Sequence, residues 1–465
     1  MGKESGSVQI FHKNLCCLML GKLKNIGKEK NLSSLMANVS VAFLGLVSFM
    51  LLTRQLSKEL FGEWVLFITL ATFVDLLRFG LTRTSSVRLL SGADKENVKV
   101  VLGTSFRINL VLLVVLTLAC WMLYGLVVAG GFEINNGYLL FLMYYPFLAL
   151  SNLSWNNAMS LFQAEQNFKR MMFVRLSNVG LFCVFLVINY ALLGLGLVEI
   201  IWVNIVVNAI SGLWCSLKNW DGLLFISQAK RNVQKELINF GKYSMGTLIS
   251  SSLLKSSDTF IIGMSPILGS AGIAMYAIPL KLTDLLGIPL HSFAMTAYPR
   301  MSKKSIQGDI MGTKKIFYSY VGIVTLLFFP VAFAGFVFAE PMVLFLGGNE
   351  YKDALPLLTL IFRVFTFYIM LLPIDRFTGV LLDSINKPKL NLYKVLVMTS
   401  ANIVLNVLAV FVFESLVAVA VGTVLFTVMG IFMGFYYLKR EIQIRGRDIF
   451  SESVLFLRNL KIHLG

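Results

Sequence analysis

Charged side chains lie inside apolar stretches of this sequence, where they are costly to bury. An ionisable group at the middle of a membrane span costs about 2.5–3.5 kcal/mol, so each such group is a candidate for a site. The group comprises Asp75, Arg78, Lys255, Asp258, Lys281, Asp284, Arg363, Asp375 and Arg376. Side chains of both signs could bind a charged substrate, take up a coupling ion or neutralise one another.

Opposite charges recur at a spacing of three residues, as in Asp75 with Arg78, Lys255 with Asp258, and Lys281 with Asp284. On a helix this spacing places both side chains on one face and within reach of each other. One interpretation is that each pair forms a structural ion pair. The other is that the charges face one another or water, because nine of them facing lipid would cost about 25 kcal/mol.

Uncharged polar residues line one face of each of two predicted spans. Asn152, Asn156 and Gln163 share one face of a predicted span, and Ser251 lies four residues before Lys255 on another. Single polar residues often serve helix packing. A continuous stripe that ends in a lysine favours the lining of a hydrated cavity.

Proline residues lie beside two of the charged groups. Pro279 and Pro289 bracket one of them, and Pro373 comes two residues before Asp375. Proline removes a backbone hydrogen bond, and such breaks are tolerated at membrane depth where a cavity or protein satisfies the freed carbonyl. We expect breaks or hinges in these two helices.

The amino-acid composition indicates whether these apolar stretches lie in water or in a membrane. The chain has 465 residues, of which 57% are hydrophobic and 14% charged, and its mean hydropathy is +0.77. A soluble domain carries about 25% charged residues. The sequence therefore predicts a membrane protein, and its net charge of +17 has an explanation other than nucleic acid, since cytoplasmic loops of membrane proteins collect Lys and Arg.

Apolar windows long enough to cross a membrane predict about 12 helical spans. The windows are 33–53, 63–82, 104–128, 138–162, 171–193, 196–217, 240–263, 270–298, 316–339, 355–382, 391–412 and 416–438. If both termini are cytoplasmic, most Lys and Arg residues fall in cytoplasmic segments, whereas Arg54, Lys58 and Lys352 fall outside. This asymmetry supports the number of spans and predicts a multi-pass membrane protein with both termini cytoplasmic.

A basic connection after the sixth span divides the chain into similar halves. The predicted segments are a basic N-terminal arm (1–31), a six-helix bundle (32–217), a cytoplasmic linker (218–239), a second six-helix bundle (240–438) and a basic tail (439–465). An even number of spans in each half predicts a parallel repeat, with a pseudo-twofold axis along the membrane normal. The fold class is thus all-α and polytopic.

Several kinds of function have no support in the sequence. The histidines and the five cysteines form no ligand set, so no metal or cofactor is expected, and no GxxxxGK[ST] motif for ATP occurs. An enzyme such as a membrane glycosyltransferase or polymerase needs catalytic acids in sizeable outer loops, and the longest predicted outer connection is short. Transport by alternating access between two bundles is the remaining mechanism.

Short motifs along the chain resemble a known family. They are Leu60-Phe61-Gly62-Glu63-Trp64, Arg78-Phe79-Gly80-Leu81, Gly272 and Tyr276 before Lys281 and Asp284, Tyr298-Pro299-Arg300-Met301-Ser302, and Leu346-Gly347-Gly348-Asn349-Glu350-Tyr351. The spacing of these motifs resembles that of the polysaccharide-transport flippases, of O-antigen and capsule type. These belong to the multidrug/oligosaccharidyl-lipid/polysaccharide (MOP) exporter superfamily. The resemblance extends over residues from about 32 to 440.

The resemblance implies a flippase of a bacterial inner membrane, which moves undecaprenyl-pyrophosphate-linked oligosaccharide from the cytoplasmic to the outer leaflet for O-antigen, capsule or exopolysaccharide synthesis. Its partners would be this lipid-linked oligosaccharide, membrane lipids, H⁺ or Na⁺ as coupling ion, and the polymerase machinery. Basic side chains would bind the pyrophosphate and amides or hydroxyls the sugars. The residues expected in the substrate site are Lys255, Lys281, Arg78, Arg363, Arg376, Asn152, Asn156, Gln163 and Ser251. Those expected to couple an ion are Asp258, Asp284, Asp75 and Asp375.

A multidrug antiporter of the same superfamily is the alternative within transport. It would bind organic cations and exchange Na⁺ or H⁺ through acids such as Asp258 or Asp284. The five cations and four acids expected inside the bundles leave a slight basic excess, which favours an anionic substrate.

Overall fold

The computed structural model describes residues 30–91 and 93–444, and these residues fold into helices with no strand among them. Most of the expected arm (1–31) and tail (439–465) lies outside them. The first half contains α2 (Lys30–Gln55), α3 (Lys58–Gly80), α4 (Arg83–Leu90), α5 (Lys95–Gly130), α6 (Asn136–Ser151), α7 (Leu153–Ala164), α8 (Phe168–Ile188), the π-helical turn η1 (Asn189–Leu193), α9 (Leu197–Leu217) and the 3₁₀ turn η2 (Leu223–Gln228). The second half contains α10 (Arg231–Gly263), α11 (Gly269–Ile306), α12 (Ile310–Val337), α13 (Ala339–Gly347), η3 (Asn349–Tyr351), α14 (Leu355–Ser384), α15 (Pro388–Phe411) and α16 (Leu416–Ile442).

The long helices of the described part match the predicted spans one to one when α6 and α7 count as one rod. Nine of the described segments are long and apolar enough to cross a membrane. The other three rods are α2, which has a shorter apolar part (Val39–Gln55), the divided α6–α7 rod and the polar-striped α10. The all-α, multi-pass membrane fold is confirmed.

The outer face of helix α5 is apolar and exposed, as expected of a helix that contacts lipid. Val114, Leu118 and Met122 lie on its outer face and are 50%, 63% and 63% exposed. Contiguous apolar surface of this extent is unfavourable in water, whereas in a bilayer it meets hydrocarbon.

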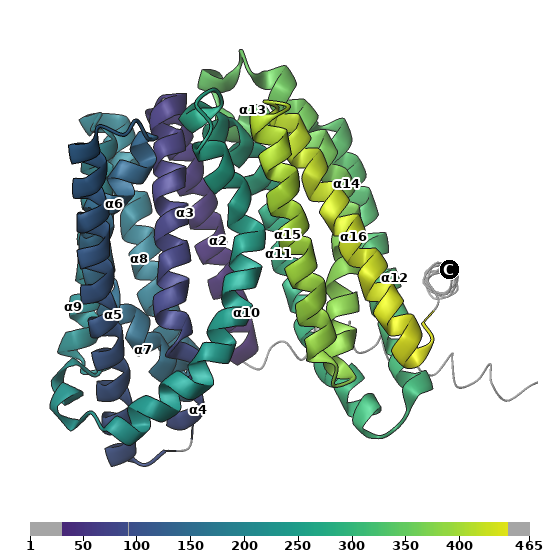
Figure 1. Cartoon of the computed structure of the whole chain (residues 1–465), viewed down its shortest axis with the longest axis horizontal. Helices are drawn as coiled ribbons and strands as arrows, with labels where there is room; N and C mark the ends of the chain where they lie inside the picture. Colours follow the sequence, from purple (N-terminus) through teal and green to yellow (C-terminus); the bar gives the residue numbers. More distant parts are fainter. Residues whose placement is uncertain (1–29, 92, 445–465) are drawn as a thin grey trace, which may run out of the picture.

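Two groups of helices diverge toward one end of the molecule (Figure 1). At the opposite end one apolar core joins the halves, because it contains Phe61 of α3, Ile273 of α11 and Leu358 of α14. At the diverging end the cores are separate: one contains Phe162 of α7, and another contains Phe317 of α12. The two halves share one core at the joined end, and α10 of the second half also stays against the first half at the diverging end, where a Cβ on Gly241 would lie 1.7 Å from the Leu81 carbonyl oxygen.

The joined end, called here the narrow end, is held by backbone contact and polar bonds. A Cβ on Gly62 would lie 1.7 Å from the carbonyl oxygen of Ser270, so α3 and α11 approach closely only because this residue is glycine. The Thr53 hydroxyl donates to the Leu346 carbonyl at 2.9 Å. Lys58 forms an ion pair with Asp353 at 2.5 Å.

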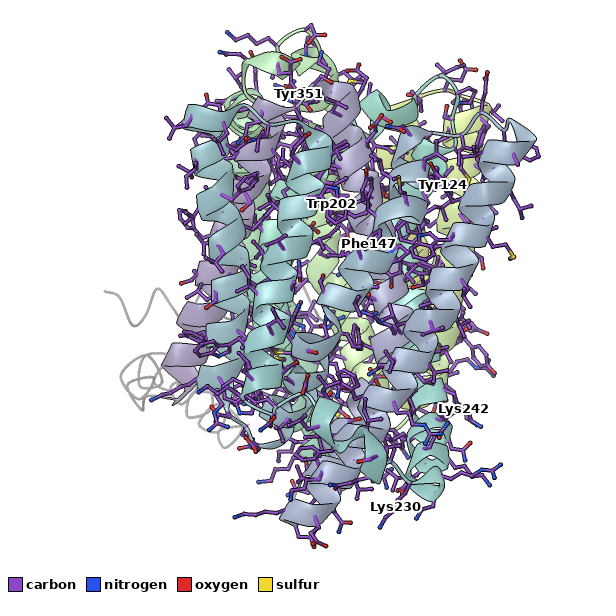
Figure 2. The ribbon with its side chains drawn as sticks, turned by 90° about the vertical axis from the view of Figure 1, so that its left-hand side faces the viewer. Tyr124, Phe147, Trp202, Lys230, Lys242 and Tyr351 are labelled. Atoms are coloured by element: carbon purple, nitrogen blue, oxygen red, sulfur yellow. The ribbon has the colours of Figure 1, made fainter. Side chains whose placement is uncertain are left out.

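The diverging end, called here the basic end, carries positive residues from several elements. Lys230 and Arg231 stand at the start of α10, and Lys303 and Lys304 in the last turn of α11. Figure 2 shows Lys230 and Lys242 at this end and Tyr351 at the other. The loops thus alternate between the ends of the molecule as the charge pattern predicts.

Proline does not interrupt the helices expected to break. Helix α11 continues through Pro279 and Pro289, and α14 continues through Pro373, so the expectation of breaks there is wrong. The broken rod is α6–α7, which divides at Asn152. Neighbouring helices can satisfy the carbonyls that proline frees, so a membrane helix tolerates it without a break.

Candidate functional site

Asp75 and Arg78 form a buried ion pair on α3, at 3.0 Å. Nη1 of Arg78 donates to the Ala149 carbonyl at 2.8 Å, and Nη2 donates to the Asn152 side chain. Asn152 and the Tyr145 hydroxyl donate to the two oxygens of Asp75, at 2.6 and 3.0 Å. The break between α6 and α7 therefore lies where Arg78 binds the last turn of α6.

Arg78 is 1% exposed, so its charge is used within the protein. Of the three pairs at a spacing of three residues, this is the one that forms an ion pair in the described structure. Its partners on α6 and Asn152 show that it fixes the broken rod against α3.

Asp258 of α10 lies in a second buried polar group, among neutral donors. Asn406 and Asn402 of α15 donate to Oδ1 at 2.6 and 3.1 Å, and the Tyr276 hydroxyl of α11 donates to Oδ2 at 2.8 Å. Thr423 of α16 lies 3.4 Å from that hydroxyl. Asp258 is 5% exposed, and the described residues place no cation within ion-pair distance of it. Lys255 therefore does not neutralise Asp258.

The amide oxygen of Asn406 is unsatisfied in this group. It is buried and has no hydrogen-bond partner among the described residues. A buried acceptor without a partner costs about 1–3 kcal/mol. Within the described part of the chain, this buried polar group thus holds a carboxylate without a cationic partner and an amide oxygen without a donor.

A third group, called here the central cluster, consists of Lys255, Lys281, Asp284, His291 and Arg376. It comes from α10, α11 and α14, and all but Lys281 are exposed. Both lysines act electrostatically on Asp284, and Nη2 of Arg376 lies 3.4 Å from Nδ1 of His291. Within the described part, neither lysine has a carboxylate within 4 Å. The cluster therefore presents three cations and one acid.

Lys281 connects the central cluster to the first half. Its ammonium lies 5.5 Å from the centre of the Phe49 ring of α2. The cluster thus begins where the joined core of the narrow end gives way to the diverging helices.

Asp375 of α14 has a partner that the sequence interpretation missed. Asp375 pairs with Lys394 of α15 at 2.6 Å, and Lys394 also donates to the Thr378 hydroxyl at 3.0 Å. Lys394 lies inside the predicted span 391–412 and is 2% exposed. Its place within an apolar window was the signal.

Arg363 lies away from the central cluster. Its guanidinium stands 5.4 Å from the ring centre of Phe336 of α12, and exposed apolar side chains such as Phe367 and Leu360 surround it on α14. This is an outward face, where an arginine lies along apolar surface.

The remaining predicted residues lie toward the basic end. Ser251 is exposed one turn before Lys255, and its hydroxyl donates to the Leu248 carbonyl at 3.0 Å. Gln163 is exposed near the end of α7, and Asn156 bonds back to the Asn152 carbonyl at 3.1 Å. No group of three or more metal-ligating side chains occurs among the described residues.

A family profile described as polysaccharide biosynthesis protein matches residues 51–356. The chain belongs to this family. The match covers all of α3 to α13, including the Asp75 pair, Asp258 and every member of the central cluster except Arg376. The resemblance to polysaccharide-transport proteins is thus confirmed. No curated protein matches the chain.

Solved structures of MOP transporters share the fold. An inward-facing multidrug resistance MATE family transporter aligns with a TM-score of 0.72 and 16% identity, covering 87% of this chain and 98% of its own. The lipid II flippase MurJ, in an inward closed conformation, aligns with a TM-score of 0.72 and 13% identity, covering 93% and 92%. A MOP superfamily transporter from Pyrococcus furiosus aligns with a TM-score of 0.62 and 17% identity, covering 88% of this chain and 94% of its own. At these identities the likeness establishes the fold.

Proposed function

We propose that this protein is a flippase that moves polyprenyl-pyrophosphate-linked oligosaccharide repeat units from the cytoplasmic to the outer leaflet. The observation that carries the proposal is the central cluster, in which Lys255 and Arg376 are exposed and Lys281 is partly exposed. Membership of the polysaccharide biosynthesis family supports a glycan as the cargo.

The chemistry of the central cluster suits a pyrophosphate. Ammonium groups act as point charges that follow a moving anion, and a guanidinium binds phosphate oxygens by two parallel hydrogen bonds. Asp284 offsets one of the three cations, so the net charge supports binding that is reversible. Arg78, paired within the fold, and Arg363, on an outward face, are left out of this site.

The basic end is the cytoplasmic side in this proposal. Cytoplasmic loops are enriched in Lys and Arg, and both termini of a chain with an even number of spans lie on that side. Residues 32–217 and 240–438 would rock against each other about the narrow end and the contact of α10 with α3, which would open the central cluster first to one side of a bacterial inner membrane and then to the other.

Asp258 is the proposed coupling residue. It is buried, accepts a hydrogen bond from Nδ2 of Asn406, whose own amide oxygen is unsatisfied, and lacks a cationic partner in the described part. Either H⁺ or Na⁺ would neutralise its charge in surroundings of low polarity. Asp75 and Asp375, which already pair with Arg78 and Lys394, are left out of this role.

Depletion of the protein followed by isolation of lipid-linked intermediates tests the function. We expect pyrophosphate-linked repeat units to accumulate and to stay inaccessible to a glycosidase added outside the cell. Unchanged intermediates together with increased sensitivity to organic cations would instead support the multidrug antiporter.

A further inference from the structure

A separate cavity of about 360 Å³ lies at the basic end of the first half, beyond the central cluster. Phe79 and Val87 of the α3–α4 segment and Leu248 of α10 form apolar parts of its wall. Arg83 of α4 and Gln163 of α7 supply polar groups. One side of the cavity is therefore apolar and another is basic.

Arg83 shares this region with a second arginine from another helix. Arg175 of α8 is the charged neighbour that acts on Arg83. Both are partly buried, and neither has an ion pair or hydrogen bond to another described residue. The acid at the end of α7, Glu165, faces Arg170 instead, at 3.6 Å.

Two neighbouring guanidinium groups without a carboxylate are an unfavourable arrangement. Partial burial removes water that would stabilise each charge, and the charges repel each other. The same arrangement fits a phosphate, which arginine binds by two parallel hydrogen bonds. Charge without a protein partner therefore indicates an anionic ligand.

The apolar wall restricts the kind of anion. Free phosphate would gain nothing from Phe79, Val87 and Leu248, whereas a lipid would bury a hydrocarbon segment there. The α3–α4 and α10 segments that form this wall belong to membrane-spanning rods, so a lipid tail can reach it from the bilayer.

We propose that this Arg83 cavity binds the phosphate group of an amphiphilic lipid before that lipid reaches the central cluster. The inference rests on the proposed flippase function and adds a first binding site to it. Leu248 stands seven residues before Lys255 on α10, a helical rise of about 10 Å. The exposed Ser251 lies between them, so one face of α10 leads from one site to the other.

Binding of farnesyl pyrophosphate to the purified protein in phosphatidylcholine nanodiscs tests the site. All variants carry Lys255→Ala, so that the central cluster is weakened. We expect Arg83→Ala to weaken binding about tenfold or more, Arg175→Ala to weaken it less, and Arg83→Lys to restore part of it. Arg88→Ala is the matched control, because Arg88 is exposed on the same helix, 4.8 Å from the Phe240 ring centre.

Arg83→Ala binding as tightly as its parent would overturn the inference, provided that both melt at the same temperature. If Arg83→Ala melts lower, Arg83→Gln replaces it and the same criterion applies. Repeating the measurement in nanodiscs that contain phosphatidylglycerol and phosphatidylcholine in equal parts identifies which lipid supplies the phosphate. Competition that depends on Arg83 indicates a phospholipid headgroup, and absence of competition indicates the isoprenyl pyrophosphate. Both results support a phosphate site.

The proposed function fails independently of this site. A protein that binds the probe through Arg83 and accumulates no lipid-linked intermediate on depletion would overturn the flippase and keep the site. If the lipid-linked intermediate accumulates on depletion and the probe binds equally well without Arg83, the flippase function stands and the Arg83 site is overturned.

Discussion

At the scale of single residues, the charged side chains inside the spans differ in what surrounds them. Arg78 and Lys394 are almost fully buried and have several protein partners each. Lys255 is exposed and has no acid within ion-pair distance in the described part. The first kind holds helices together, and the second is available to a ligand.

Replacement of Arg78 should act on stability. Removing one partner of a buried ion pair leaves the other charge uncompensated, so Arg78→Ala should lower the free energy of unfolding by about 3–5 kcal/mol. Denaturation in detergent measures this. Adding Asp75→Asn should recover part of the loss. A variant with wild-type stability and no transport would show instead that Arg78 contacts the substrate.

Which charges are free could not be read from the sequence. Apolar runs located Asp75, Lys255 and Asp258 in spans, but whether a neighbour at three residues is a partner depends on the rotation of each helix. Asp258 bonds to Asn402 and Asn406, far along the chain. The sequence did hold a signal for these two asparagines, because they lie four residues apart inside an apolar window. A polar side chain in a membrane span is costly to bury and is therefore a candidate for a site.

At the scale of elements, the contact between α3 and the η3–α14 turn at the narrow end depends on pH. A hydrogen bond from Lys58 is the main cause that lowers the pKa of Asp353 from its ordinary value. A carboxyl with a lowered pKa stabilises the contact above its unfolded-state pKa, and this contribution is lost as the pH falls through the lowered value. The contact should therefore loosen in acid.

Hydrogen exchange of residues 349–354 across the acidic range measures this loosening. Protection should fall as Asp353 becomes protonated, after correction for intrinsic exchange. The Asp353→Asn variant should show low protection with little dependence on pH. Identical profiles for the two proteins would mean that the ion pair does not hold the turn.

Helix α10 carries a hydrated face in this account, from Ser251 to Lys255. A cysteine at Ser251 in a protein without other cysteines should react with a water-soluble thiol reagent. Cys120, Cys183 and Cys215 are buried and free, so their replacement removes no disulfide. Ala274→Cys, at a fully buried position of α11, is the unreactive control. Complete protection at position 251 under every condition would mean that this face is packed.

At the scale of the whole molecule, the distribution of apolar cores sets which motions are possible. One core spans both halves at the narrow end, and each half has its own core toward the basic end. The two diverging groups of helices can therefore change their angle while each keeps its own core, with α10 staying against the first half. Hydropathy and loop charge predicted the rods and their alternation, whereas the shape of the shared core depends on contacts between distant residues such as Gly62 and Ser270.

The central claim is that the exposed cations between the halves carry an anionic, lipid-linked glycan. Its most direct test is the initial rate at which reconstituted protein moves polyprenyl-pyrophosphate-linked oligosaccharide across vesicles, measured by exposure to an impermeant glycosidase. We predict that Lys255→Ala abolishes the rate, that Lys255→Arg retains part of it, and that Lys235→Ala, at an exposed position near the start of α10, leaves it unchanged. A wild-type rate for folded Lys255→Ala protein would contradict the account.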